Sequence, residues 1–269
     1  MGNKILAMDI DGTLTNSRKE ITAATKAAIQ EAMNRGHKVV LASGRPTPGM
    51  RSCAEELELD RYGGYLLSYN GAYIVEYRTG EVVYQKDLPL VLLPELYAFA
   101  RENGCGLITY LGEDIISAFP PDQYVGLTSR NTGMPVRRVD DFLGFVDFSI
   151  HKCLMTAEPK QAKLCEERLR EIFGSRMGIY RSEPYFIEVV PWGITKEEGL
   201  KRIQEALGMK REDVVCCGDG FNDIEMIRYA GVGVAMGNAQ PVVKEAADYI
   251  TASNDEDGLI EVIDKFLTK

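Results

Sequence analysis

Short apolar runs of strand length, each followed directly by a polar turn that contains glycine, constrain this chain most strongly. The clearest runs are residues 4–10, 39–42 and 214–217. Their apolar character is almost continuous, which is typical of parallel strands buried on both faces of a sheet. Segments with the three- and four-residue spacing of helices lie between such runs, so the order predicts right-handed β-α-β crossovers. We therefore expect an α/β fold whose core is a Rossmann-like, doubly wound parallel sheet.

The middle of the chain differs from both ends. Residues from about 82 to 190 alternate strand-like runs with helical segments, and turn-rich stretches separate them. The strand-like runs are residues 106–110, 149–156 and 185–190, and the helices are residues 92–102 and 160–173. A chain of 269 residues is long enough for about two domains. We expect residues 1–82 and 190–269 to form one domain, with an α+β domain of residues 83–189 inserted into it.

The charge balance is acidic, with 31 basic against 40 acidic residues and a formal net charge of −9. A nucleic-acid-binding protein usually carries a basic face that neutralises phosphates, whereas the basic residues here are scattered along the chain. We therefore expect no nucleic-acid partner. An anionic small-molecule substrate would have to be attracted locally, by a metal ion and a few Lys or Arg side chains, because the net charge repels it.

Apolar stretches are short throughout the sequence. None approaches the roughly 20 residues that cross a bilayer, and Asp9 interrupts any signal-peptide core. We therefore expect a cytoplasmic protein without a membrane partner.

The six cysteines and two histidines argue against a structural zinc site, because no C-x-x-C pair is present. Cys216 and Cys217 follow two valines in an apolar run. We interpret them as small buried side chains, with a regulatory vicinal disulfide as the alternative.

The first polar turn reads D-x-D-G-T at residues 9–13. Asp9 and Asp11 stand two positions apart, so on a strand they would face the same side. Two carboxylates at the end of a buried strand are costly unless a cation or a function retains them. With a metal ion, one can be a nucleophile and the other a general acid and base. A surface turn rich in Asp and Gly is the alternative, but the buried-type residues that lead into this turn favour a function.

The second and third polar segments carry weaker signals. Ser43, Gly44 and Arg45 follow the second run, where a hydroxyl and backbone N–H groups can bind phosphate oxygens, although such residues are also common in ordinary turns. Lys196 stands at the start of a helix and could place a positive charge on a phosphate. Taken alone, Lys196 would more often be a solvated lysine and Thr195 a helix cap.

The fourth segment reads G-D-G-x-N-D at residues 218–223. Asp219 and Asp223, with the amide of Asn222 between them, suit a hard divalent cation such as Mg²⁺. The alternative is structural, with Asn222 as a helix N-cap and Asp223 in the first turn.

The four segments in this order resemble the motifs of the haloacid dehalogenase-like (HAD) superfamily, and specifically of its Cof-type phosphatases. The resemblance covers the whole chain, and the first and fourth motifs are highly specific to it. The segment Asn70-Gly71-Ala72 is also similar to one of Cof-type proteins. The long gap between Ser43 and Lys196 is similar to the site where that family inserts a large α+β cap.

The resemblance implies a role for each matching residue. Asp9 would attack phosphorus to form an aspartyl-phosphate, and Asp11 would protonate the leaving alkoxide and then activate water. Ser43 would bind the phosphoryl group, with Gly44 and Arg45 beside it. Lys196 would neutralise the phosphoryl charge.

The same resemblance implies a Mg²⁺ site. The ligands would be Asp9, the backbone carbonyl of Asp11, and Asp219, supported by Asp223 and by Asn222, which would also bind phosphate. Without a cation, repulsion among the four carboxylates would raise their pKa values and disarm the nucleophile. Glu197 departs from the glycine that commonly follows this lysine in Cof-type proteins, and it adds an acid beside the phosphate site.

The inserted cap would select the substrate. Glu188 lies in a run that resembles the Cof-type return strand and could face the cleft, so we take it as a candidate substrate contact. Arg130, His151, Arg181 and Glu183 lie near other expected strand ends, where a solvated or internally paired side chain is the commoner state.

We therefore expect a Mg²⁺-dependent phosphatase that hydrolyses phosphate monoesters of small metabolites, sugar phosphates first among them, as a monomer or weak homo-oligomer. Asp11 favours ester cleavage, because an oxygen leaving group needs a proton. Two alternatives remain open: a phosphomutase of the same superfamily, and a regulator that binds a phosphorylated ligand without turnover. Phosphate release that depends on Asp9 and Asp11 would distinguish them.

Overall fold

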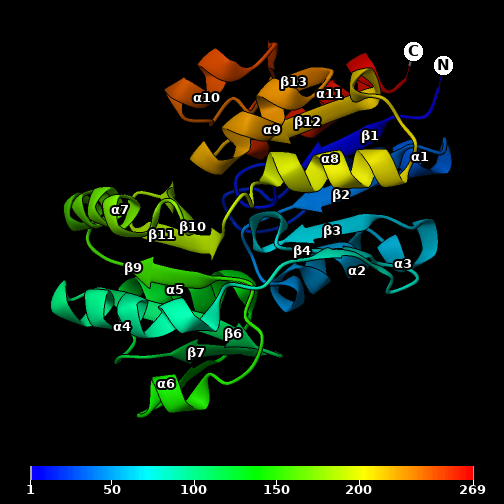
Figure 1. Ribbon diagram of the computed structural model, residues 1–269. Helices are drawn as coiled ribbons and strands as arrows, with labels where there is room; N and C mark the ends of the chain where they lie inside the picture. The colour runs from blue at the N-terminus through cyan, green and yellow to red at the C-terminus, as the bar shows by residue number, and fades with distance from the viewer. Residues whose placement is uncertain (1, 269) are drawn as a thin grey trace. The chain divides into compact units, whose positions relative to one another are not determined.

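A computed structural model describes residues 2–268 of the chain. Its contacts divide into a core unit, up to Tyr84 and from Thr195 onwards, and an inserted unit, Gln85–Ile194. The boundaries expected from the sequence, 82/83 and 189/190, fall a few residues earlier. Each unit has its own sheet (Figure 1). Among the described residues, no helix is both long enough and apolar enough to span a bilayer.

The core unit is built on eight strands: β1 (Ile5–Met8), β2 (Lys38–Ala42), β3 (Tyr65–Ser68), β4 (Tyr73–Glu76), β5 (Val82–Gln85), β12 (Val214–Gly218), β13 (Val232–Ala235) and β14 (Tyr249–Ile250). Their order in the sheet is β14-β13-β12-β1-β2-β3-β4-β5. The strands from β14 to β3 are parallel, and β4 is antiparallel to β3. The carboxyl ends of the parallel strands therefore lie along one edge of the sheet.

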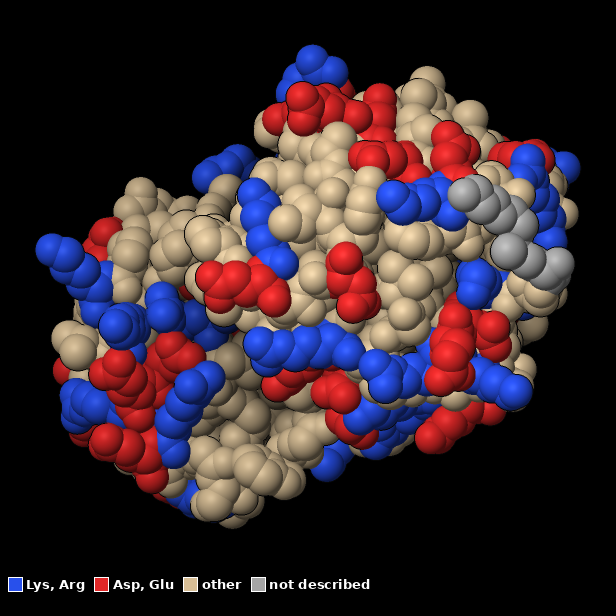
Figure 2. Space-filling view, turned by 90° about the horizontal axis from the view of Figure 1, so that it is seen from above, with Lys and Arg blue, Asp and Glu red and all other residues tan. Residues whose placement is uncertain are grey.

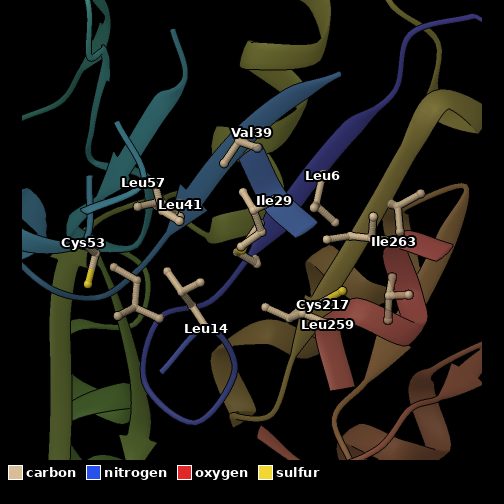
Figure 3. Packing of buried hydrophobic residues seen from close by; sticks show 14 of the residues in the cluster. Leu6, Leu14, Ile29, Val39, Leu41, Cys53, Leu57, Cys217, Leu259 and Ile263 are labelled. Carbon is tan, nitrogen blue, oxygen red and sulfur yellow. The ribbon is translucent and has the colours of Figure 1, made fainter. Parts of the chain in front are cut away.

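Helices cover both faces of this sheet. They are α1 (Ala23–Asn34), α2 (Arg51–Glu56), α3 (Leu59–Tyr62), α8 (Lys196–Ala206), α9 (Ile224–Tyr229), α10 (Pro241–Ala246) and α11 (Gly258–Phe266). Leu6 and Met8 of β1 belong to an apolar cluster with α1 and α11, part of which is drawn in Figure 3. Ile5 and Ala7 of the same strand belong to a second cluster, with α8 and α9. This alternation confirms the doubly wound α/β fold predicted from the apolar runs.

The adjacent cysteines follow the same alternation. Cys217 lies in the cluster with α1 and α11, and Cys216 lies in the cluster with α8 and α9. Both are fully buried with free thiols. Their side chains point to opposite faces of β12, as expected for small residues of a buried strand.

The inserted unit is built on six strands: β6 (Gly106–Leu111), β7 (Asp114–Ser117), β8 (Val136–Arg138), β9 (Cys153–Thr156), β10 (Met177–Glu183) and β11 (Phe186–Pro191). Their order is β10-β11-β9-β6-β7-β8, and every pairing is antiparallel except β7 with β8. Its helices are α4 (Leu93–Glu102), α5 (Gln123–Thr132), α6 (Phe142–Phe145) and α7 (Pro159–Phe173). The α+β character expected of this segment is present, with α4 and α7 close to their expected bounds.

Surface charge is mixed rather than segregated. Figure 2 shows Lys and Arg side chains interspersed with Asp and Glu on the face that it draws. Some exposed charges of the protein form local pairs, such as Arg35 with Glu31 and Arg61 with Glu58. Exposed pairs of this kind contribute little to stability, typically about 0–1 kcal/mol each.

Candidate active site

Polar residues follow the ends of four neighbouring parallel strands in the core unit. Asp9 follows β1, Ser43 follows β2, Asn70 follows β3 and Asp219 follows β12. Because Met8 pairs with residues near the ends of both β2 and β12, these side chains meet at one edge of the sheet. Open α/β sheets bind their ligands at this edge.

Lys196 is buried between two carboxylates. Its Nζ donates to Oδ1 of Asp9 at 2.6 Å and to Oδ1 of Asp223 at 2.7 Å, and its side chain is 1% exposed. Burial alone would lower the pKa of Lys196, but Asp223 and Asp9 raise it above its ordinary value, so the ammonium stays charged. The structure therefore excludes a solvated lysine. Thr195 caps α8 as expected, since its side chain accepts from the backbone N–H of Glu198.

Three carboxylates gather around this lysine. One oxygen from each of Asp9, Asp219 and Asp223 lies within 4.8 Å of the others. Thr13 donates to Oδ1 of Asp219 at 2.8 Å. Oδ2 of Asp223 accepts from the backbone N–H groups of Asp219 (3.0 Å) and Gly220 (2.9 Å). The side chain of Asp223 therefore binds the backbone at the start of its own turn and holds the turn after β12 in shape.

Gly218 makes this close turn possible. A Cβ atom at this position would lie 2.5 Å from Cβ of Asp223 and 2.6 Å from its carboxylate carbon. Any larger residue would push Asp223 away from Lys196. The G-D-G-x-N-D spacing is therefore a requirement of backbone approach as well as of charge.

The carboxylate cluster carries more negative charge than Lys196 balances. Burial, with repulsion from neighbouring carboxylates, raises the pKa of Asp9 to about 7 and the pKa of Asp219 to about 8. A divalent cation would restore both groups to their ionised state. Oxygen ligands of this kind fit Mg²⁺, which prefers carboxylates and water.

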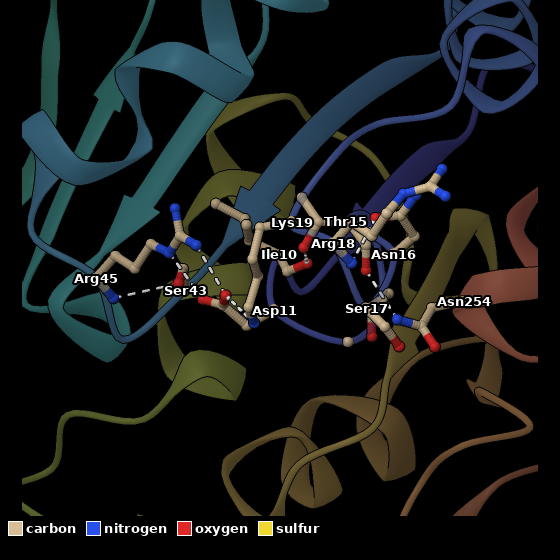
Figure 4. Close-up of polar contacts among 12 residues, drawn as sticks. Ile10, Asp11, Thr15, Asn16, Ser17, Arg18, Lys19, Ser43, Arg45 and Asn254 are labelled. Carbon is tan, nitrogen blue, oxygen red and sulfur yellow. Dashed lines mark hydrogen bonds and ion pairs between the residues drawn. The ribbon is translucent and has the colours of Figure 1, made fainter. Parts of the chain in front are cut away.

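Asp11 lies in a different electrostatic environment, shown in Figure 4. Its two oxygens accept from Nη2 and Nε of Arg45, both at 2.7 Å, and Nζ of Lys19 lies 2.9 Å from Oδ1. Burial would raise the pKa of Asp11, but the hydrogen bonds and charge of Arg45, with a smaller contribution from Lys19, hold it below its ordinary value. The Asp11 carboxylate is therefore ionised in this arrangement.

The residues predicted to bind phosphate lie near the carboxylate cluster and near Asp11. Ser43 is buried, and its Oγ accepts from the backbone N–H of Arg45 at 3.1 Å. The guanidinium of Arg45 is engaged with Asp11 and with the carbonyl of Gly49. Asn222 donates from Nδ2 to Oδ1 of Asn70 at 2.9 Å.

Glu197 does not enter the site as an unbalanced acid. Its carboxylate lies 2.7 Å from Nζ of Lys201, one turn further along α8. Lys201 also pairs with Glu198 at 2.8 Å. The negative charge of Glu197, which replaces the glycine of the Cof-type pattern, is therefore paired with Lys201 on the same helix.

Comparison with known proteins identifies the family. A family model for haloacid dehalogenase-like hydrolases matches residues 6–263. The chain belongs to this family.

Individual relatives agree with this assignment. A haloacid dehalogenase-like hydrolase from Bacteroides thetaiotaomicron has a crystal structure that covers 98% of this chain and 99% of its own, with 42% identity and a TM-score of 0.91. The structure of the HAD subclass IIB sugar phosphatase BT4131 covers 98% of this chain and 99% of its own, with 29% identity and a TM-score of 0.84. The 5-amino-6-(5-phospho-D-ribitylamino)uracil phosphatase YcsE of Bacillus subtilis (strain 168) is 32% identical over 260 residues, which are 97% of this chain and 94% of that protein. The resemblance inferred from the motifs is confirmed, and the chain is a hydrolase of this superfamily.

Glu188 of this haloacid dehalogenase-like hydrolase lies in the inserted unit, on β11. It is 3% exposed; its Oε2 lies 2.7 Å from Nζ of Lys152, and Ser182 donates to its Oε1 at 2.7 Å. Lys152 is equally buried, so the pair neutralises itself within the unit. A substrate role for Glu188 remains a prediction.

Two of the other candidates of the inserted unit have local partners, Arg181 and His151. Arg181 donates to Oε2 of Glu166 at 2.6 Å, and Nδ1 of His151 lies 3.1 Å from Asp87. Arg130 lies in the last turn of α5, and Glu183 ends β10. The paired state expected for such side chains is observed for Arg181 and His151.

Two participants were missed from the sequence. Lys19 approaches Asp11 from a surface loop, and no motif marks it, although its φ of +64° is unusual for lysine. Asn70 belongs to a segment similar to one of Cof-type proteins, but its contact with Asn222 depends on the order of the strands.

Proposed function

We propose that this haloacid dehalogenase-like hydrolase is a Mg²⁺-dependent phosphatase that hydrolyses phosphate monoesters of small metabolites, with sugar phosphates as the first class to test. The observation that carries the proposal is the position of Asp9. Its carboxylate is held by a buried lysine, beside a carboxylate cluster suited to a divalent cation. The phosphatase activities of the related proteins support the same reaction type.

Asp9 is placed to act as the nucleophile. Lys196 holds its Oδ1, which leaves Oδ2 to attack phosphorus. The new bond from Oδ2 to phosphorus forms as the bond from phosphorus to the ester oxygen breaks, and the leaving oxygen takes up the proton of Asp11 in its protonated form. Lys196 supplies a fixed positive charge beside the incoming phosphoryl group.

Asp11 is placed to act as the base of the second step. Arg45 and Lys19 keep it ionised, so it can accept a proton from the water that hydrolyses the aspartyl-phosphate. To donate a proton in the first step, Asp11 would first have to become protonated, and its pairing with Arg45 opposes this. A substrate that draws Arg45 away would ease that step.

Mg²⁺ would be held by Asp9, the backbone carbonyl of Asp11, and Asp219. It would neutralise charge on the carboxylates and on the phosphoryl oxygens. Both oxygens of Asp223 already accept hydrogen bonds, so we assign it to holding Lys196 and the turn after β12. We also propose a cytoplasmic location and a monomeric or weakly associated state.

The test is phosphate release from a panel of sugar phosphates, nucleotides and pyridoxal phosphate, with Mg²⁺ or with EDTA. Wild type, Asp9→Asn and Asp11→Asn are compared after circular dichroism has established that each is folded. We expect release that requires Mg²⁺ and both aspartates, with losses of about 10²-fold or more for Asp11→Asn. Binding of a phosphorylated compound without release by the wild type would instead favour a mutase or a regulator.

A further inference from the structure

Asn70 is a buried polar residue beside the candidate active site, and the chemistry described above assigns it no role. It is 0% exposed and lies in the turn Tyr69–Gly71 after β3. Its Oδ1 accepts from Asn222, and its backbone N–H donates to the carbonyl of Ser43 at 3.0 Å. Its Nδ2 has no hydrogen-bond partner among the described residues. An unpaired buried donor destabilises the fold, so its retention calls for a reason.

The backbone at Asn70 is strained. Its φ is +57°, and Tyr69 before it has a φ of +51°. Left-handed conformations are unfavourable for residues other than glycine, although asparagine tolerates them better than most. Because Tyr69 and Asn70 both have a positive φ, the backbone turns here and does not continue as an extended strand. Strain of this kind is found where a fold positions a side chain for a ligand.

The neighbouring loop leaves room for the Asn70 amide. A Cβ atom on Gly44 would lie 3.2 Å from both Nδ2 and Oδ1 of Asn70. The amide therefore packs directly against the Ser43-Gly44 turn, whose hydroxyl and N–H groups are the candidate phosphate ligands. The site of the unpaired donor and the proposed phosphate site are thus adjacent.

The contact between Asn70 and Asn222 joins two loops at the carboxyl ends of the parallel strands. Asn222 comes from the turn after β12, and Asn70 comes from the turn after β3. In the sheet, β1 and β2 lie between these two strands. The amide pair therefore joins the loops on either side of Asp9 and Ser43. Because Oδ1 faces Asn222, the NH₂ end of Asn70 is the end left for a ligand.

We propose that Nδ2 of Asn70 donates a hydrogen bond to a non-bridging oxygen of the phosphoryl group that is transferred to Asp9. This rests on the proposed phosphatase function and adds a phosphoryl-binding residue to it. A bond from a neutral amide to an anionic oxygen in a buried site is stronger than one between neutral groups. It strengthens as charge develops during transfer, so it stabilises the transition state more than the ground state.

Two substitutions separate this role from a structural one. Asn70→Asp keeps the shape and the acceptor that faces Asn222, but replaces the unpaired NH₂ with an oxygen and adds a carboxylate charge. Asn70→Gly removes the amide but accepts a φ of +57° without strain.

Glu58→Gly is the matched control. Glu58 also has a left-handed φ, of +58°, and also accepts a side-chain amide hydrogen bond, from Gln30 at 2.9 Å, but it lies at the start of α3.

The readouts are kcat and KM for para-nitrophenyl phosphate with Mg²⁺, the inhibition constant of orthovanadate, and Mg²⁺ affinity by calorimetry. We expect kcat to fall about 10²–10³-fold in both Asn70 variants, the loss typical for one such donor. Orthovanadate inhibition should weaken in parallel, while the Mg²⁺ affinity of the neutral variant, Asn70→Gly, stays at the wild-type value. Glu58→Gly should match the wild type in all three.

Three results would overturn the assignment. Wild-type kcat and vanadate inhibition in both Asn70 variants would overturn it alone and leave the phosphatase function standing. Loss of Mg²⁺ affinity together with activity in Asn70→Gly would show that Asn70 only shapes the site. Absence of Mg²⁺- and Asp9-dependent phosphate release in the wild type would overturn the proposed function, and this assignment with it.

Discussion

Lys196 alone does not balance the carboxylates around it. It contacts Asp9 and Asp223, whereas the side-chain partner of the Asp219 carboxylate is the neutral hydroxyl of Thr13. Burial holds Asp9 and Asp219 in part protonated at neutral pH, with pKa values of about 7 and about 8. In the unfolded chain both would ionise near pH 4. Their contribution to stability is therefore complete below pH 4 and is lost as pH rises through 7 and 8.

Asp219→Asn should remove the part of this loss that Asp219 causes. In EDTA, the free energy of unfolding of the variant should exceed that of the wild type by an amount that grows between pH 5 and pH 8, on the order of 1 kcal/mol or more at pH 8. Urea denaturation at pH 5, 6.5 and 8 measures the difference. Saturating Mg²⁺ should stabilise the wild type much more than the variant. A difference that is independent of pH would contradict the charge imbalance described here.

At the scale of the elements, the sequence predicts the features that depend on a local pattern of residues. The apolar runs that precede Asp9, Ser43 and Asp219 specify strands, and the glycine turns after them specify where those strands end. The partners of these residues depend instead on which loops the sheet places side by side. The pairing of Arg45 with Asp11, the burial of Lys196 between two carboxylates, and the contact between Asn222 and Asn70 all follow from the order β12-β1-β2-β3.

The inserted unit was less predictable for a different reason. Strands β7, β8 and β10 are short or half-exposed and carry no long apolar run. The run expected at residues 149–156 begins as a strand only at Cys153, because Ile150 to Lys152 form other contacts. These strands form mainly because they pair with neighbouring strands, and a local sequence pattern does not show that pairing.

His37 ties the first strand of the core to its last helix. Its Nδ1 accepts from the backbone N–H of Lys4 at 3.0 Å, which leaves the proton on Nε2, 3.0 Å from the carbonyl of Leu267. Protonation of Nδ1 would break the contact with Lys4. Burial lowers the pKa of His37, partly opposed by the bond to Leu267. The neutral ring therefore stabilises the fold above the ordinary histidine pKa, near 6.5, and this stabilisation is lost as pH falls below it.

His37→Gln supplies a reference that does not titrate. The thermal midpoint of the wild type should exceed that of the variant at pH 7.5, and this difference should be smaller at pH 5.5. Differential scanning calorimetry in Mg²⁺ at both values measures it, with the metal site kept loaded. A gap of constant size would mean that His37 contributes through packing alone.

At the scale of the whole molecule, the two units have separate apolar cores. The core unit buries one cluster on each face of its sheet, and the inserted unit buries a third against α4 and α7. The proposed metal ligands all belong to the core unit. Mg²⁺ should therefore stabilise the core unit directly.

Leu169→Ala tests this division, with Leu200→Ala as its counterpart. Both leucines are fully buried, the first in α7 of the inserted unit and the second in α8 of the core unit. Each substitution should cost about 2–5 kcal/mol in its own unit. Hydrogen exchange should accelerate in residues 85–194 for Leu169→Ala and in the core unit for Leu200→Ala. Equal acceleration in both units for either variant would show that they unfold together.

The central claim is that Asp9 becomes phosphorylated during turnover. The measurement is acid quench of the enzyme with Mg²⁺ and its best phosphomonoester substrate during the first turnovers, followed by digestion and mass spectrometry of the peptide that contains residues 9–13. We predict one phosphoryl group on Asp9 in the wild type, more of it in Asp11→Asn, where hydrolysis of the intermediate is slowed, and none in Asp9→Asn. Release of phosphate by an enzyme that never carries it on Asp9 would contradict the account.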